Sequence, residues 1–194
     1  MPGLRESKIL KAKTAIQGHA LRLFARQGYS ATTVEQIAEV AEVSPSTFFR
    51  YFKSKEGVVL YDSLDPVIIE AFRKQPANIS TIRALRRAMM DVFSDLSSEE
   101  RELEMQRFEL QRTIPELRMN MYEEMVRNID LLAETIAERT NKSSDDLSVR
   151  NVAGAVIGVG MAALLQAYKR PKEVDSVNAF DEALKRLEKG LDLN

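Results

Sequence analysis

Apolar residues recur every three or four positions through most of the chain, which is the spacing of one face of an α-helix. The first such stripe covers residues 7–27 and ends before Gly28, a residue that readily forms the left-handed stop of a helix. Two shorter helices are predicted at about 33–41 and 44–52, and a fourth is expected over 55–63. The N-terminal third is therefore predicted to be all-helical.

Capping residues mark the starts of the two short helices. The Thr33 hydroxyl can accept a backbone N–H while Gln36, three residues on, reaches back in a capping box. Ser44 is a good N-cap, and Pro45 fits the first helical position, where its missing N–H costs nothing. Two short helices joined by a tight turn, with a longer helix packed across them, predict a helix-turn-helix.

The helix over 44–52 has two different faces. Phe48 and Phe52, four residues apart, share one side and can be buried together. Hydroxyls, a guanidinium and aromatic rings with no acid lie away from that pair: Ser46, Thr47, Arg50 and Tyr51, with Phe49 near the boundary. Such a surface suits phosphates and base edges, so the pattern favours DNA binding.

The charge distribution agrees with a DNA contact at one end of the chain. Residues 1–60 contain nine Lys and Arg against five Glu, whereas the rest contains 19 basic and 24 acidic residues. A basic head on an acidic body is what a nucleic-acid contact confined to the N-terminal region would produce.

The composition argues against an enzyme and against a metal or other cofactor. The chain has no Cys and one His, His19, which lies in the first helix among apolar neighbours. Zinc sites need several Cys or His ligands, and a Ser-His-Asp arrangement would have to be built inside a helix-turn-helix. A helical ligand-binding or adaptor module without specific DNA binding is the alternative, and the basic surplus argues against it.

The segment LFARQGYSATTVEQIAEVAEVSPSTFFRYFKSKEGVV resembles the DNA-binding domain of TetR-type bacterial transcriptional regulators. The resemblance covers residues 7–60 and rests on the order and spacing of Phe24 with Gly28, Thr33 with Val34, Ile37-Ala38, Val43-Ser44, Thr47-Phe48, Tyr51-Phe52 and Ser54-Lys55-Glu56. It implies an all-helical homodimer, a repressor that binds a palindromic operator and leaves it when a small molecule enters the C-terminal domain.

The resemblance also implies residue roles. Thr33 and Lys55 would contact phosphates, Ser46 and Thr47 would face the major groove, and Tyr51 would donate its phenol to the DNA backbone. Two positions depart from the family pattern: Phe49 replaces a usual Tyr, and Pro45 replaces a base-reading Lys or Gln. The candidate DNA-binding residues are Thr33, Ser44, Pro45, Ser46, Thr47, Phe49, Arg50, Tyr51 and Lys55.

The remaining two-thirds of the chain is also predicted to be helical, giving about nine helices in all. Helical spacing extends over about 82–96, 99–114, 116–139, 145–169 and 175–191, with a break at Arg170-Pro171. No Gly/Ser linker separates the two parts. The predicted division is a helix-turn-helix domain over 1–62 and a helical ligand-binding and dimerisation domain over 63–194.

Two features of this part predict its functions. Residues 152–165 are apolar on all sides and contain small residues, so with the last helix they predict a four-helix interface between two subunits. The seven internal methionines all lie beyond residue 60, as core or as the lining of a plastic cavity. The candidate lining for an apolar or amphipathic ligand, with an acyl chain on a polar carrier left open, is Met89, Phe93, Phe108, Met121, Tyr122 and Met125.

The sequence predicts a cytoplasmic protein with no membrane partner. The N-terminal segment has no apolar stretch of signal-peptide length. The longest uninterrupted apolar run, 152–165, is shorter than the roughly 20 residues that cross a bilayer.

Overall fold

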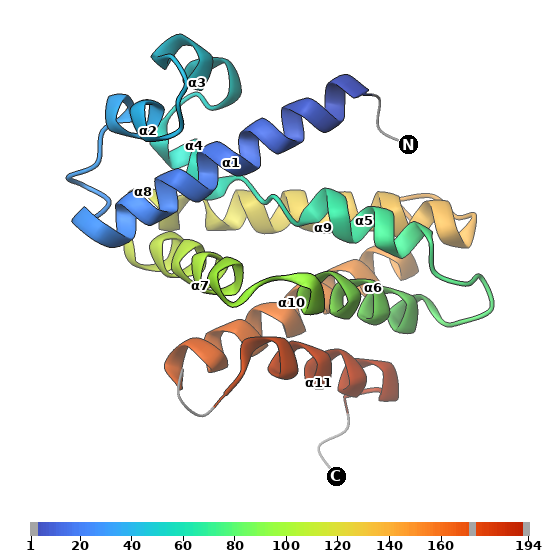
Figure 1. Ribbon diagram of the computed structural model, residues 1–194. Coiled ribbons are helices and arrows are strands. Elements are labelled where there is room, and N and C mark those ends of the chain that lie inside the picture. The colour runs from blue at the N-terminus through green and yellow to red at the C-terminus, as the bar shows by residue number, and fades with distance from the viewer. Residues whose placement is uncertain (1–3, 171–173, 192–194) are drawn as a thin grey trace. The chain divides into compact units, whose positions relative to one another are not determined.

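The computed structural model describes residues 4–170 and 174–191, and within these ranges every regular element is a helix. Figure 1 shows the eleven helices found there. In chain order they are α1 (Leu4–Gln27), α2 (Val34–Val40), α3 (Pro45–Tyr51), α4 (Lys55–Leu60), α5 (Asp65–Arg73), α6 (Thr81–Asp95), α7 (Ser98–Thr113), α8 (Pro115–Met119), α9 (Met121–Thr140), α10 (Leu147–Lys169) and α11 (Ser176–Lys189). The predicted all-α class is confirmed.

The helix count exceeds the expected nine for two reasons. The segment Asp65–Arg73 forms an additional helix, α5, and the helix predicted over 116–139 is divided into α8 and α9 at Asn120. The Asn120 side-chain amide donates to the carbonyl of Glu116 at 3.0 Å, which is the local competition by which asparagine ends helices. The fourth helix also ends at Leu60, earlier than expected, because Tyr61 has an extended backbone. The predicted break at Pro171 lies outside the described residues.

The contacts divide the chain into two compact units that do not follow a single cut. The first contains the residues up to Ser63 together with Ser97–Met121, and the second contains Leu64–Leu96 and the residues from Tyr122 onward. Helices α7 and α8 thus pack with the N-terminal helices. The functional division at residue 62 stays a prediction, because a contact grouping does not test where a binding activity resides.

The first unit is built around α1. Its core joins buried residues of α1, such as Ile16 and Phe24, to Phe48 of α3 and to Val58 of α4. Leu117 of α8, which is fully buried, belongs to the same cluster. The helix-turn-helix pair α2–α3 is therefore supported on one side by α1, and the unit's core depends on a residue more than 50 positions further along the chain.

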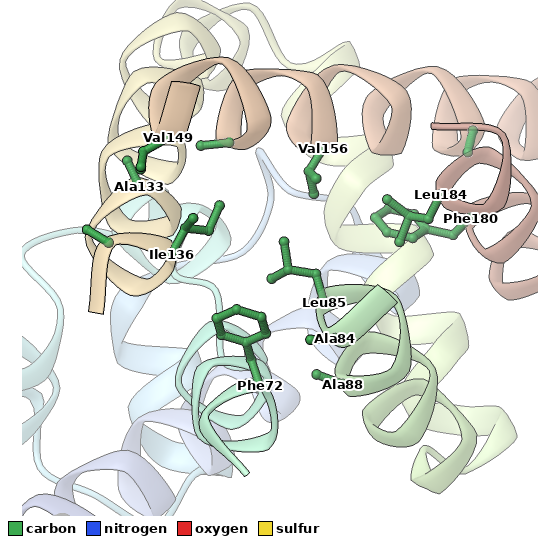
Figure 2. Close-up of a cluster of buried hydrophobic side chains, with 13 residues drawn as sticks. Phe72, Ala84, Leu85, Ala88, Ala133, Ile136, Val149, Val156, Phe180 and Leu184 are labelled. Carbon is green, nitrogen blue, oxygen red and sulfur yellow. The ribbon is translucent and has the colours of Figure 1, made fainter. Parts of the chain in front are cut away.

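The second unit gathers its apolar side chains from five helices. Figure 2 shows that α5, α6, α9, α10 and α11 each direct residues into one cluster, among them Phe72, Leu85, Ile136, Val156 and Leu184. Burial of a large aliphatic or aromatic side chain stabilises a fold by about 1.5–3 kcal/mol. This cluster therefore fixes the positions of α6 and α11 with respect to each other.

Helix α10 has one buried face and one uncovered face. Gly160 lies under the ring of Phe180 of α11, where an added Cβ would come within 2.7 Å of that ring. Gly158 is exposed, and a Cβ there would meet nothing within 4 Å. By length and composition alone α10 could cross a membrane, a test that the core helix of a soluble protein also passes, and 28% of its most apolar window is buried within the chain.

Candidate nucleic-acid interface

The two helices of the helix-turn-helix begin as their sequences predict. The Thr33 hydroxyl accepts the Gln36 N–H, and the Gln36 side chain accepts the Thr33 N–H at 3.0 Å, which completes the capping box of α2. Ser44 caps α3 by accepting the Thr47 N–H at 3.1 Å, and Pro45 occupies the first helical position. These caps satisfy backbone donors that a helix start leaves without partners, so they fix where α2 and α3 begin.

The turn between α2 and α3 is equally well defined. Glu42 has a positive φ of 53°, a backbone conformation that reverses the chain direction within one residue. The next N–H, that of Val43, returns to the carbonyl of Ala38 at 2.9 Å. Helix α3 therefore follows α2 after a short, hydrogen-bonded turn.

The inner face of α3 is held by aromatic packing. Phe48 is fully buried, and its ring lies 5.9 Å from that of Phe52, centroid to centroid. The Phe49 ring meets Phe48 edge to face at 5.6 Å while remaining 51% exposed. The predicted burial of Phe48 with Phe52 is confirmed, and Phe49 is placed on the surface.

Hydroxyl groups cluster at the N-terminus of α3. The Ser44 Oγ lies 2.8 Å from the Ser46 Oγ and donates to the Thr47 Oγ1 at 2.9 Å. Pro45 and Ser46 are exposed, and Thr47 is half-buried. The three hydroxyls thus present an ordered row of donors and acceptors at the end of the helix that is expected to enter a groove.

The second turn of α3 carries its positive charge. Arg50 is exposed, and its guanidinium lies 5.2 Å from the centroid of the half-buried Tyr51 ring. No acidic residue occupies α3, whose sequence is PSTFFRY. A cation held against an aromatic ring at the surface suits contact with a phosphate.

Lys55 is bound within the protein. Its ammonium donates to the carbonyls of Tyr29 and Thr32 at 3.0 and 3.3 Å and lies 4.3 Å from the centre of the Tyr29 ring. The Tyr29 hydroxyl donates to Glu56 at 2.9 Å, and burial together with this bond raises the pKa of Tyr29. Lys55 therefore joins the start of α4 to the loop before α2, and its expected phosphate contact stays a prediction.

Two amide side chains that are not among the predicted site residues donate hydrogen bonds to the C-terminal end of α4. Gln17 of α1 is 2% exposed and donates to the carbonyls of Val58 and Tyr61 at 2.8 and 2.6 Å. Gln111 of α7 donates to the carbonyl of Val59 at 3.0 Å. Gln17 could have been found from the sequence, because it is a polar residue beside Ile16 on the apolar stripe of the first helix.

A cluster of charged side chains lies next to the C-terminal end of α4. The side chain of Arg107 is 12% exposed and lies between Glu104 at 2.8 Å and Asp62 at 2.7 Å. Burial raises the pKa of the Glu104 carboxyl, and the negative charge of Asp62 adds to that rise while Arg107 opposes it. The cluster connects the segment after α4 to α7.

The six residues predicted to line a ligand cavity are distributed over both units. In the second unit, Met89, Phe93 and Met125 are partly buried, and Tyr122 is 70% exposed. In the first, Phe108 is buried, and the side chain of Met121 lies outside the described residues. Phe93 stacks edge to face on Phe180 at 5.7 Å. The lining of a cavity by these residues stays a prediction.

No metal site accompanies this interface in the part of the chain that the structure describes. There, no three His, Asp or Glu side chains are grouped so that they could hold an ion.

An all-helical chain with a capped helix-turn-helix at its N-terminal end defines the class of helix-turn-helix transcriptional regulators. Residues 18–61 match the tetR family of bacterial regulatory proteins, and residues 79–192 match the MftR C-terminal domain of that family. The chain is 33% identical over 196 residues to the HTH-type transcriptional regulator TcmR of Streptomyces glaucescens, covering 96% of this chain and 87% of that protein. The chain belongs to the TetR family.

Solved structures share the fold. The FadR repressor of Thermus thermophilus, determined with lauroyl-CoA, aligns with a TM-score of 0.59 at 23% identity over 94% of this chain and 96% of its own. SmeT, the repressor of a Stenotrophomonas maltophilia multidrug efflux pump, was solved with triclosan and aligns with a TM-score of 0.58 at 18% identity over 90% of both chains. At these identities the likeness concerns the fold.

Proposed function

We propose that this TetR-family regulator is a cytoplasmic repressor that binds a palindromic operator as a homodimer and is released by an apolar or amphipathic small molecule. The acid-free outer face of α3 carries the proposal, since its hydroxyls and Arg50 are offered to solvent on a rigidly capped helix. Thr33, Ser44, Pro45, Ser46, Thr47, Phe49, Arg50, Tyr51 and Lys55 form the proposed DNA surface.

Replacement of Thr47 by alanine is expected to change sequence preference. A hydroxyl that contacts a base edge contributes about 1–3 kcal/mol of discrimination, so Thr47→Ala should weaken binding to the operator about five- to 150-fold and binding to random DNA much less. Fluorescence anisotropy measures both affinities, with labelled DNA from upstream of the gene that encodes this protein and with labelled random DNA. Thr113→Ala, a matched change at the end of α7, should bind as wild type.

Wild-type protein that does not distinguish upstream DNA from random DNA at moderate salt would contradict operator recognition and favour the adaptor alternative. Binding that is specific yet unaffected by Thr47→Ala would remove Thr47 from the interface.

The homodimer is proposed from the uncovered face of α10. Exposed small residues such as Gly158 and Ala162 permit close helix approach, and α11, which packs against α10, would take part in the same interface. Two-fold pairing through this face would place the two α3 helices, the proposed recognition helices of the dimer, about 34–36 Å apart or at a multiple of that distance.

Two glycines of α10 are expected to respond differently to a larger side chain. Gly158→Leu should give a folded monomer that has lost operator affinity, because the new side chain blocks only the partner. Gly160→Ala should instead lower protomer stability by about 1–3 kcal/mol, because its Cβ overlaps Phe180. Analytical ultracentrifugation with thermal unfolding separates the two, and a wild-type monomer at micromolar concentration would exclude the dimer.

The ligand class is proposed from Met89, Phe93, Phe108, Met121, Tyr122 and Met125, and from the lauroyl-CoA and triclosan bound by two proteins of the same fold. Titrating the operator complex with either compound should release DNA. A tenfold loss of affinity corresponds to about 1.4 kcal/mol of coupling between ligand and DNA, within the usual range. A finding that neither compound changes operator affinity or thermal stability would contradict the ligand pocket proposed from these residues.

A further inference from the structure

Positively charged side chains gather where α6 and α11 pack together, and the proposed function assigns them no role. A cavity of about 480 Å³ between these helices is lined by five cations and one acid: Arg83, Arg86, Arg87, Lys185, Lys189 and Glu188. All belong to the second unit, and the buried cluster that holds α6 against α11 contains Leu85 and Leu184 (Figure 2). The positions of the charges are therefore set by a packed core.

Two of the arginines are oriented by carboxylates that leave part of each guanidinium available. Arg83 donates from Nε to Glu188 at 2.7 Å, and Arg86 donates from Nε to Asp181 at 2.6 Å. Neither terminal Nη group makes a hydrogen bond to another described residue. Arg73 differs, since it gives both Nε and Nη2 to Glu138. One-point fixation through Nε leaves the outer donors of Arg83 and Arg86 to bind an anion.

The acids that orient these arginines are themselves well shielded from solvent. The Asp181 side chain is 15% exposed, and that of Glu188 is 18% exposed. Burial opposes ionisation of Asp181, but the hydrogen bonds from Arg86 and Lys185 outweigh it and lower its pKa. Both carboxylates thus serve as fixed supports beneath the cations.

Two of the remaining three cations have no acid to neutralise them, whereas Lys185 pairs with Asp181 and Glu182, each at 2.7 Å. Arg87 and Lys189 are exposed, and neither forms an ion pair within the described residues. Arg83 with Arg87, and Lys185 with Lys189, are also like-charge pairs four residues apart, which cost a helix a few tenths of a kcal/mol each. Two rows of cations one turn long therefore face one hollow, and a single anion that reached both rows would remove this repulsion.

We propose that the α6–α11 cleft binds a small molecule that carries two or more linked phosphates. A guanidinium matches two phosphate oxygens at once, and Lys189 adds a point charge at the rim. A single phosphate is too small to reach the cations of α6 and those of α11 at the same time. Linked phosphates are long enough to contact both rows of cations. The hollow has the volume of a small-molecule site, which favours such a ligand over a macromolecular surface.

Sodium tripolyphosphate is the probe for this site, titrated calorimetrically into the full chain at low salt, with sodium chloride of matched ionic strength as the blank. Arg87→Gln/Lys189→Gln removes the two cations that pair with no described residue, so folding should be retained. Arg118→Gln/Lys169→Gln removes one exposed arginine and one exposed lysine elsewhere. The cleft variant should lose at least about tenfold in affinity, while the control variant binds as wild type.

Equal weakening in both double variants would overturn the proposal, because general charge attraction would explain it. So would the absence of heat above the chloride blank, or loss of duplex-DNA binding in the cleft variant without tripolyphosphate binding by wild type. The titration contains no DNA, so it gives its answer whether or not the operator proposal holds.

Discussion

Phe48→Ala is expected to lower the stability of the first unit by about 3–5 kcal/mol, whereas Phe49→Ala next to it costs about 1 kcal/mol. Phe48 is fully buried between α1 and α3, so its removal leaves a cavity in the core that supports the recognition helix. The Phe49 ring is half in solvent and loses only its edge contact with Phe48.

Hydrogen exchange is the suitable measurement, because it reports on α2–α4 separately from the second unit. Protection of these helices should fall sharply in Phe48→Ala and persist in Phe49→Ala, which should nevertheless bind operator DNA more weakly. Comparable loss of protection in both variants would mean that the inner and outer faces of α3 have been assigned wrongly.

Arg107→Met is expected to cost about 3–5 kcal/mol at neutral pH, because it leaves two carboxylates without their shared cation in a poorly solvated place. Glu104 and Asp62 both depend on this guanidinium. Arg118→Met, at an exposed position, should be close to neutral.

The cost of Arg107→Met should also depend on pH with a defined sign. Folding already raises the pKa of Glu104, and without the cation it rises further. An acid that holds its proton more tightly when folded favours the folded state at low pH and loses that advantage as pH rises through the raised pKa. Urea unfolding should therefore show a larger deficit at about pH 8 than at about pH 5. A deficit that is constant across this range would show that the carboxylates remain solvated.

The sequence was sufficient for the parts of the fold that depend on near neighbours. The caps at Thr33 and Ser44 and the buried pair of Phe48 with Phe52 are all as expected, because each involves residues at most four apart. Hydrogen bonds and apolar contacts over such distances are set by helical geometry alone.

Features that join distant segments could not be predicted in the same way. The capture of Lys55 by the carbonyls of Tyr29 and Thr32 requires knowing how the loop after α1 folds. The hydrogen bond from Gln111 to the Val59 carbonyl joins residues 52 positions apart. Leu117, which is buried in the same core as Val59, lies still further along the chain. A single-sequence pattern gives the burial of a residue and leaves its partner unspecified, so it could not show that α7 and α8 pack with the N-terminal helices.

The support of α4 by side chains from two other helices determines when this part of the protein can mature during synthesis. Residues 55–60 form too short a helix to be stable alone, and Gln111 and Leu117 leave the ribosome some 50 residues after them. The nascent helix-turn-helix therefore remains incompletely packed until α7 and α8 have been synthesised. The DNA-binding region of this chain would then reach its fully packed form only after α7 and α8 have been synthesised, and a product that ended before residue 111 would lack the contacts of Gln111 and Leu117.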